Sequence, residues 1–185
     1  VVSPEISVMY RVVSTGTILT TSWGEGFKLP SFFALGHPIV GNPGLVPETS
    51  SSREASIEQI CLNGRMTLSA SVFSSRYRDI VDFHEGPPPQ LLNRSQAAAR
   101  GGEIEVDLSV DPSLSLFAHL SKVETDIRGT DEGLRNRPEW RGGLVVRWQP
   151  VSRLTIRFSA LYVDEALDSS IPTGDRYLDS YTRTD

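Results

Sequence analysis

The chain has 185 residues, of which 38% are hydrophobic, and a formal net charge of −5 at pH 7. The negative charge argues against nucleic-acid binding, which requires a basic face. The single cysteine, Cys61, excludes an internal disulfide and a cysteine-based zinc site. The mean hydropathy of −0.20 is that of a soluble protein, but it does not exclude a membrane barrel, whose strands are apolar on only one face.

Alternating apolar and polar residues predict strands along almost the whole chain. The first two strands are predicted over residues 6–12 and 17–27. The charge-free stretch Leu29–Pro47 follows, and its four prolines and three glycines forbid a continuous spanning helix, so we expect a loop there. The later strands are predicted over residues 53–61, 65–83, 97–110, 114–127, 140–148 and 154–164, with a last one from residue 177. The total is about nine strands, and no amphipathic helix of ordinary length is predicted.

The segment 101–110, with the sequence GGEIEVDLSV, alternates most regularly. Successive side chains of a strand point to opposite sides of the sheet. The apolar side chains on one side are those of Ile104, Val106, Leu108 and Val110. The side chains on the other side are those of Glu103, Glu105, Asp107 and Ser109. One side must meet water and the other must meet hydrocarbon, which is either a protein core or the tails of a lipid bilayer.

Short and long connections alternate between the predicted strands. The short ones contain the Gly, Pro, Asp and Ser residues of tight turns and cover residues 14–16, 62–64, 111–113 and 149–152. The long ones are irregular and cover residues 28–52, 84–96, 128–139 and 165–176. Outer-membrane barrels have short turns at the periplasmic rim and long loops outside, whereas a β-sandwich has turns of mixed length at both ends. The alternation favours an up-and-down transmembrane barrel, with a soluble β-sandwich as the alternative.

Five motifs, in the same order along the chain, resemble the family of TonB-dependent outer-membrane receptors. The first, WGEGFKLPSF at 23–32, resembles a strand of that family that ends in Gly-Phe-(Arg/Lys)-x-Pro-Ser. The second, GNPGLVPETSSSREASIEQ at 41–59, resembles its Asn-Pro-x-Leu-x-Pro-Glu loop and the Glu-rich strand that follows. Further matches lie at 69–83, 99–126 and 134–150, and the last of these resembles an Asn-Arg-Pro strand opening. The resemblance covers nearly the whole chain.

This resemblance implies both a fold and a function. The fold is an all-β, antiparallel, up-and-down transmembrane β-barrel of 22 strands around a plug domain. Residues 1–185 would form about nine strands of that barrel, without the plug and the last strands. The family imports ferric siderophores, cobalamin, haem or similar nutrients through the bacterial outer membrane, driven by the periplasmic TonB protein, which pulls on a segment before the plug. The implied partners are outer-membrane lipid, the plug, TonB and a ferric-chelate or cobalamin-like ligand, and neither enzymatic activity nor a cofactor is implied.

The long loops are expected to carry the ligand contacts, because loops on a rigid scaffold commonly determine specificity. The side chains best able to stack on or pair with an aromatic, acidic chelate are those of Phe32, Phe33, His37, Tyr77, Arg78, His84, Arg135 and Arg137. The charged side chains expected to face the lumen are those of Glu54, Glu58, Glu103, Glu105, Asp107, Arg147 and Arg157. These charges either hydrogen-bond the plug or only solvate the lumen, and the sequence leaves both roles open.

Other kinds of chemistry find little support in the sequence. His37, His84 and His119 lie far apart and lack the spacing of metal ligands, so we expect solvated loop or lumen residues. The serines have no nearby His-Asp pattern, and no nucleophilic site is predicted. Two alternative functions stay open, a passive outer-membrane porin and a soluble β-sandwich binding module such as an adhesin. The porin would lack a plug, and the sandwich would be monodisperse without detergent.

Overall fold

The computed structural model describes residues 2–84, 87–128, 136–167 and 177–185. Its main strands are β1 (Glu5–Val12), β2 (Thr17–Lys28), β3 (Glu48–Cys61), β4 (Met66–His84), β5 (Gln90–Asp111), β6 (Leu114–Ile127), β7 (Trp140–Val151), β8 (Leu154–Val163) and β11 (Tyr181–Thr184). The shorter elements are the helix α1 (Phe32–Gly36), the 3-10 turn η1 (Leu62–Gly64) and the two-residue strands β9 (Ala166–Leu167) and β10 (Tyr177–Leu178).

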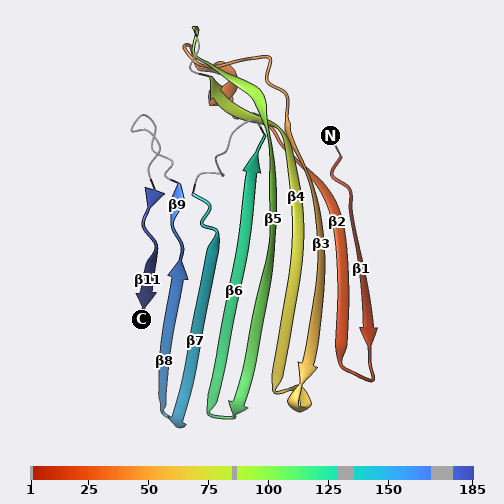
Figure 1. Ribbon diagram of the computed structural model, residues 1–185, viewed down its shortest axis with the longest axis vertical. Coiled ribbons are helices and arrows are strands. Elements are labelled where there is room, and N and C mark those ends of the chain that lie inside the picture. Colours follow the sequence, from red (N-terminus) through yellow and green to blue (C-terminus); the bar gives the residue numbers. More distant parts are fainter. Residues whose placement is uncertain (1, 85–86, 129–135, 168–176) are drawn as a thin grey trace.

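The main strands form one antiparallel sheet of nine strands, in the order β1-β2-β3-β4-β5-β6-β7-β8-β11 (Figure 1). Each strand pairs with the next main strand along the chain, while β9 and β10 pair with each other. Antiparallel neighbours of this kind need only hairpin connections. The predicted fold class, an all-β sheet of up-and-down antiparallel strands, is confirmed.

Two strands begin earlier than the alternation predicted. β3 begins at Glu48 rather than at residue 53, and β5 begins at Gln90 rather than at residue 97. The added residues are mostly polar and show no alternation, but they are paired in register, as Glu48 is with Lys28. Hydrogen bonding to the neighbouring strand, rather than burial of one face, sets these limits. The long connection expected over residues 84–96 is therefore wrong, since only residues 85–89 separate β4 from β5.

The connections lie at two opposite ends of the sheet (Figure 1). At one end, which we call the short-turn end, the strands are joined at residues 13–16, 62–65, 112–113 and 152–153. At the other, which we call the long-loop end, lie residues 29–47 with α1, the far end of the β4–β5 hairpin, and the described residues of the two later connections, 128, 136–139, 164–167 and 177–180. The predicted separation of short connections at one end from longer ones at the other is confirmed except between β4 and β5, whose connection is short because this hairpin reaches beyond the rest of the sheet.

One face of the sheet is apolar across its width. Side chains that pair in register point to the same face: Ile104 pairs with Ala70 and Leu120, and on the opposite face Glu105 pairs with Ser69. We call these the apolar face and the polar face. From β1 to β8, the apolar face includes Val8, Leu19, Ile57, Leu68, Val106, Leu116, Val146 and Phe158. The alternation expected for residues 103–108 is confirmed.

No second layer covers either face within the described residues. No large side chain there is completely buried, and Ile104 is 56% exposed. A β-sandwich requires two sheets whose inner faces cover each other, so the soluble-sandwich alternative is wrong for this chain. Among the described helices, none is long and apolar enough to cross a membrane.

Candidate functional site

The charged residues expected to face the lumen all lie on the polar face. Glu58 of β3 pairs with Ser69 of β4, which pairs with Glu105 of β5. Arg147 of β7 pairs with Arg157 of β8 and shares the face of Glu105 through β6. The others lie on the same face because they are an even number of positions from these residues along β3 or β5; they are Glu54, Glu103 and Asp107. The structure thus brings these charges onto one surface.

The seven charges expected to face the lumen are separated by sign along the polar face. The acids lie on β3 and β5, whereas Arg147 and Arg157 lie directly opposite each other on β7 and β8. Within the described residues, neither arginine forms an ion pair with an acidic side chain. Like charges directly opposite each other destabilise a sheet. The arginine pair therefore lacks a compensating charge in this part of the chain.

Two aromatic side chains crowd the polar face above glycines. The imidazole of His119 lies over Gly143, its partner in register, and a methyl group on Gly143 would collide with the ring. The phenyl ring of Phe73 lies over Gly101 in the same way, with its Cζ atom 2.6 Å from where a Cβ atom would be. A hollow of about 490 Å³ lies beside His119 and is lined by residues of β5, β6, β7 and β8. The glycines make room for these rings, because a side chain at either position would collide with the ring above it.

The histidines do not form a metal site in the described part of the chain. No three His, Cys, Asp or Glu side chains there are close enough together to hold a metal ion. His37 Nδ1 instead accepts hydrogen bonds from the backbone N–H groups of Ile39 and Val40, each at 3.3 Å. His119 has the ring of Phe117 beside it, with 5.7 Å between the ring centroids. Both imidazole rings thus interact with neighbouring groups of the fold.

At the long-loop end, Phe32, Phe33 and His37 lie on or next to α1, not in a wholly irregular loop as we expected. Ser31 is the N-cap of this helix, because its Oγ accepts a hydrogen bond from the backbone N–H of Ala34 at 3.1 Å. Phe32 is 94% exposed, and the ring centroid of Phe33 is 4.6 Å from that of His37. This short helix therefore presents two aromatic rings at the surface.

Tyr77, Arg78 and His84 also lie outside loops, within β4: the first two still pair with β3, and His84 lies further along, where β4 continues to pair with β5. Their side chains do not share one face, since Tyr77 points to the polar face and Arg78 to the apolar face. A β-bulge follows, where the pairing shifts between Tyr77 and Ile80 and Asp79 has a φ angle of 58°. Bulges redirect side chains and are common beside functional sites.

The remaining expected ligand contacts lie elsewhere. Arg137 lies between β6 and β7, beside a hollow of about 320 Å³ that is also lined by Glu139, Asp164 and Glu165. Arg135 lies outside the described residues. The expected ligand contacts thus fall in three places, on α1, on the β4–β5 hairpin and before β7, rather than in one site.

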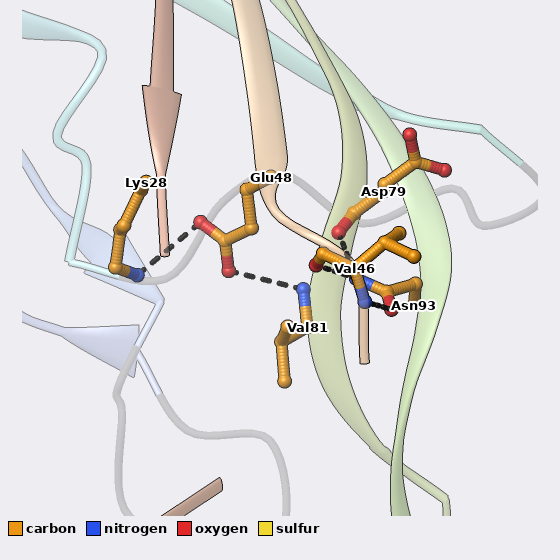
Figure 2. Close-up of polar contacts among 6 residues, drawn as sticks. All are labelled: Lys28, Val46, Glu48, Asp79, Val81 and Asn93. Carbon is orange, nitrogen blue, oxygen red and sulfur yellow. Dashed lines mark hydrogen bonds and ion pairs between the residues drawn. The ribbon is translucent and has the colours of Figure 1, made fainter. Parts of the chain in front are cut away.

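Asn93, for which we predicted no role, joins the first two of these places. Its Oδ1 accepts a hydrogen bond from the backbone N–H of Val46 at 2.9 Å (Figure 2). Its Nδ2 donates to the carbonyl oxygens of Val46 at 3.0 Å and Asp79 at 2.6 Å (Figure 2). We predicted an irregular connection at Asn93. Its neighbours could therefore not be predicted, because they follow from the long pairing of β4 with β5.

Glu48 makes a second contact of this kind. Its carboxylate accepts a hydrogen bond from the backbone N–H of Val81 at 3.1 Å and forms an ion pair with Lys28 at 3.2 Å (Figure 2). The sequence matched Glu48 to a motif of the receptor family without assigning it a role. Its place directly after a loop rich in Pro and Gly is the signal that could have identified it.

At the short-turn end, Asp111 stabilises the turn between β5 and β6. Its Oδ1 accepts hydrogen bonds from the hydroxyl and the backbone N–H of Ser113, both at 2.7 Å. These bonds, with that of the hydroxyl first, favour the charged carboxylate and lower the pKa of Asp111. The turn lines a hollow of about 430 Å³ together with Arg65 and Arg147.

Solved structures share this fold at low sequence identity. The siderophore receptor PirA from Acinetobacter baumannii is 14% identical, with a TM-score of 0.80 over 98% of this chain and 33% of that chain. The ferric-catecholate import receptor Fiu from E. coli K12 is 16% identical, with a TM-score of 0.77 over 96% and 27% of the two chains. The copper transporter OprC is 15% identical, with a TM-score of 0.79 over 98% and 30%. The chain therefore spans no more than a third of each of these proteins.

The family model of the TonB dependent receptor-like β-barrel matches residues 1–185. This match confirms the resemblance found in the five motifs. It also agrees with the single up-and-down sheet, whose two faces differ in polarity from β1 to β8. The chain belongs to the family of TonB-dependent receptor β-barrels.

Proposed function

We propose that the chain forms part of the wall of an outer-membrane receptor that takes up a ferric siderophore, cobalamin or a similar nutrient actively. The observation that carries this proposal is a sheet with an apolar face across its width and a charged face behind it. The apolar face would contact the lipid of the outer membrane, and the polar face would line the lumen. The fold is shared with proteins described as a siderophore receptor and as ferric-catecholate and ferric yersiniabactin receptors, which supports a ferric chelate as the cargo.

Residues 1–185 would then be one part of a barrel domain of 22 strands. The sheet of nine strands has two edges, formed by β1 and β11. Lipid cannot satisfy the hydrogen-bonding groups of an open edge. We infer that further strands of the same receptor continue the wall at both edges and close the barrel.

The proposed partner of the polar face is a plug domain inside the lumen. The pair of Arg147 and Arg157 would bind acidic groups of the plug, because charge-assisted hydrogen bonds offset the repulsion of two adjacent arginines. The acids on the other side of the face would bind basic groups; they are Glu54, Glu58, Glu103, Glu105 and Asp107. Opposite charges on these two parts of the polar face would fix the orientation of the plug.

The proposed ligand contacts lie at the long-loop end, which would face the outside of the cell. Exposed rings such as Phe32 and Phe33 would stack on an aromatic ligand, and arginines would pair with its acidic groups. The other proposed contacts are His37, Tyr77, Arg78, His84, Arg135 and Arg137. Arg78 is the least favourably placed because it points to the apolar face. TonB would then drive release through the plug, and no covalent step is required.

Uptake of a ferric catecholate labelled with radioactive iron tests this function. We expect iron-limited cells to lose uptake when the full-length receptor is deleted, and to lose it equally when TonB is deleted. Uptake that requires the receptor but not TonB would indicate the alternative, a passive porin. If uptake of ferric catecholates, ferric hydroxamates and cobalamin is all independent of the receptor, the proposed cargo classes are wrong.

A further inference from the structure

The loop at residues 29–47 is bonded to an edge of β5. The pairing of β5 with β6 extends to Ala97 and Ile127. Closer to the start of β5, Leu91 bonds with the loop instead: its backbone N–H donates to the carbonyl of Val40 at 2.8 Å, and its own carbonyl accepts from Asn42 Nδ2 at 3.0 Å. Residues 40–42 thus take the place of a neighbouring strand beside the β4–β5 hairpin.

Asn93 strengthens this attachment at a second position. Its side-chain amide pairs with both the N–H and the carbonyl of Val46, as a peptide group of a neighbouring strand would (Figure 2). The same amide reaches the carbonyl of Asp79 in the β-bulge of β4. One side chain therefore holds the end of the loop, β5 and the bulge in a fixed arrangement.

Glu48 fixes the base of the loop against β4. The pairing of β3 with β4 extends to Thr49 and Arg78. The carboxylate of Glu48 accepts a hydrogen bond from the backbone N–H of Val81, three residues further along β4. The Glu48 side chain is only 20% exposed. The ion pair with Lys28 closes the two ends of the loop onto each other.

We propose that Asn93 and Glu48 are positioning residues, which hold the loop with α1 and the β4–β5 hairpin as one ligand-contacting unit. The proposal rests on the proposed function, because the loop carries Phe32 and Phe33 and the hairpin carries Tyr77. A ligand that needs the docked arrangement binds with an apparent Kd that rises as the docked fraction falls. Loosening the junction therefore weakens binding although every ligand contact is still present.

Hydrogen exchange of the purified full-length receptor in detergent micelles tests whether the loop and the β4–β5 hairpin are held together as one unit. We expect Asn93→Ala to accelerate the exchange of residues 40–46 and of residues 79–93 together, with β6, β7 and β8 unchanged. The matched control is Gln96→Ala in the same strand, which removes a bond from Arg128 and does not contact the loop. Faster exchange in only one of the two segments, or an equal effect of Gln96→Ala, would overturn the proposal.

Two substitutions of Glu48 separate its hydrogen bond from its ion pair. Glu48→Gln keeps an oxygen acceptor for Val81 and loses the charge, whereas Glu48→Ala loses both. We expect the Val81 amide to exchange rapidly in Glu48→Ala, because its hydrogen-bond acceptor is lost. In Glu48→Gln its exchange should be nearly normal, because the Lys28 side chain is 76% exposed and such ion pairs contribute little. Equal exchange in these two variants would contradict the role given to the hydrogen bond.

Binding of a ferric catecholate to whole cells tests the functional part. We expect Asn93→Ala to raise the half-saturating concentration about tenfold, with the maximal rate of uptake per receptor unchanged. A receptor that is merely misfolded would lose maximal rate instead. A loosened junction with an unchanged half-saturating concentration would overturn the proposal. If the wild-type receptor binds neither a ferric catecholate, nor a ferric hydroxamate, nor cobalamin, the proposed cargo classes are wrong, while the exchange experiment still decides whether the unit exists.

Discussion

The middle of the sheet and the long-loop end are held together by different physical rules. In the middle, each strand repeats the same alternation, and neighbouring rows such as Ala70, Ile104 and Leu120 form one continuous face. At the long-loop end, single side chains such as Asn93 and Glu48 fix the position of a whole segment. A residue of the first region matters through the face it occupies, and a residue of the second through the atoms it bonds. Substitutions should therefore behave differently in the two regions.

A charge on the apolar face should be the most damaging change. Val106 lies in the middle of that face and pairs with Leu68 and Ala118. We expect Val106→Arg to destabilise the full-length barrel by about 2–4 kcal/mol, because the guanidinium would lie in hydrocarbon. The measurement is the fraction of receptor that keeps its compact, heat-modifiable form in electrophoresis with SDS.

The neighbouring residue provides the matched control. Glu105 is one position away on β5, points to the polar face and is paired with Ser69 and His119. Glu105→Arg should leave the folded fraction close to that of the wild type. Equal losses for the two substitutions would contradict the assignment of the apolar face to lipid.

The same contrast explains how much of the fold was predictable. Burial of one face imposes an alternation on the sequence, so strands such as residues 114–127 were located to the residue from that pattern alone. The beginnings of β3 and β5 were missed because residues 48–52 and 90–96 are held by ladder hydrogen bonds. Backbone hydrogen bonds leave no mark on the sequence, since every residue except proline can form them.

The candidate site follows the same division. The seven charges predicted to face the lumen, from Glu54 to Arg157, share one face because strand periodicity fixes where they point, and their contact with a plug stays a prediction. The ligand contacts were placed in loops, but Tyr77, Arg78 and His84 lie in β4. The junction at Asn93 was missed, because an amide that pairs with a peptide 47 residues away has no periodic signature.

A substitution that crowds the polar face should destabilise the barrel less than a charge on the apolar face. An alanine at position 143 would collide with the ring of His119, so we expect Gly143→Ala to destabilise the barrel by about 1–3 kcal/mol. The control is Gly142→Ala on the apolar face, where the nearest atom is the flexible Cδ1 of Leu120 at 3.3 Å, and the change should stay within about 0.5 kcal/mol. Adding His119→Ala to Gly143→Ala should restore most of the stability, and a double mutant that is no better than Gly143→Ala would show that the ring is not the cause.

The weakest effect should be confined to the short turn at Asp111. Its pKa is lowered in the folded protein, so the stabilisation by the bonds from Ser113 is present above the ordinary value of 3.8 and is lost as the pH falls through the lowered value. After correction for the intrinsic rate, the exchange of the Ser113 amide should therefore become faster as the solution is acidified below that pH. Asp111→Asn keeps an oxygen acceptor without a titrating proton, and its Ser113 exchange should not depend on pH. The thermal stability of the barrel should change little in either protein through this turn, because Asp111 is exposed and other strand pairs are independent of it. Equal pH dependence in the two proteins would assign the effect to another group.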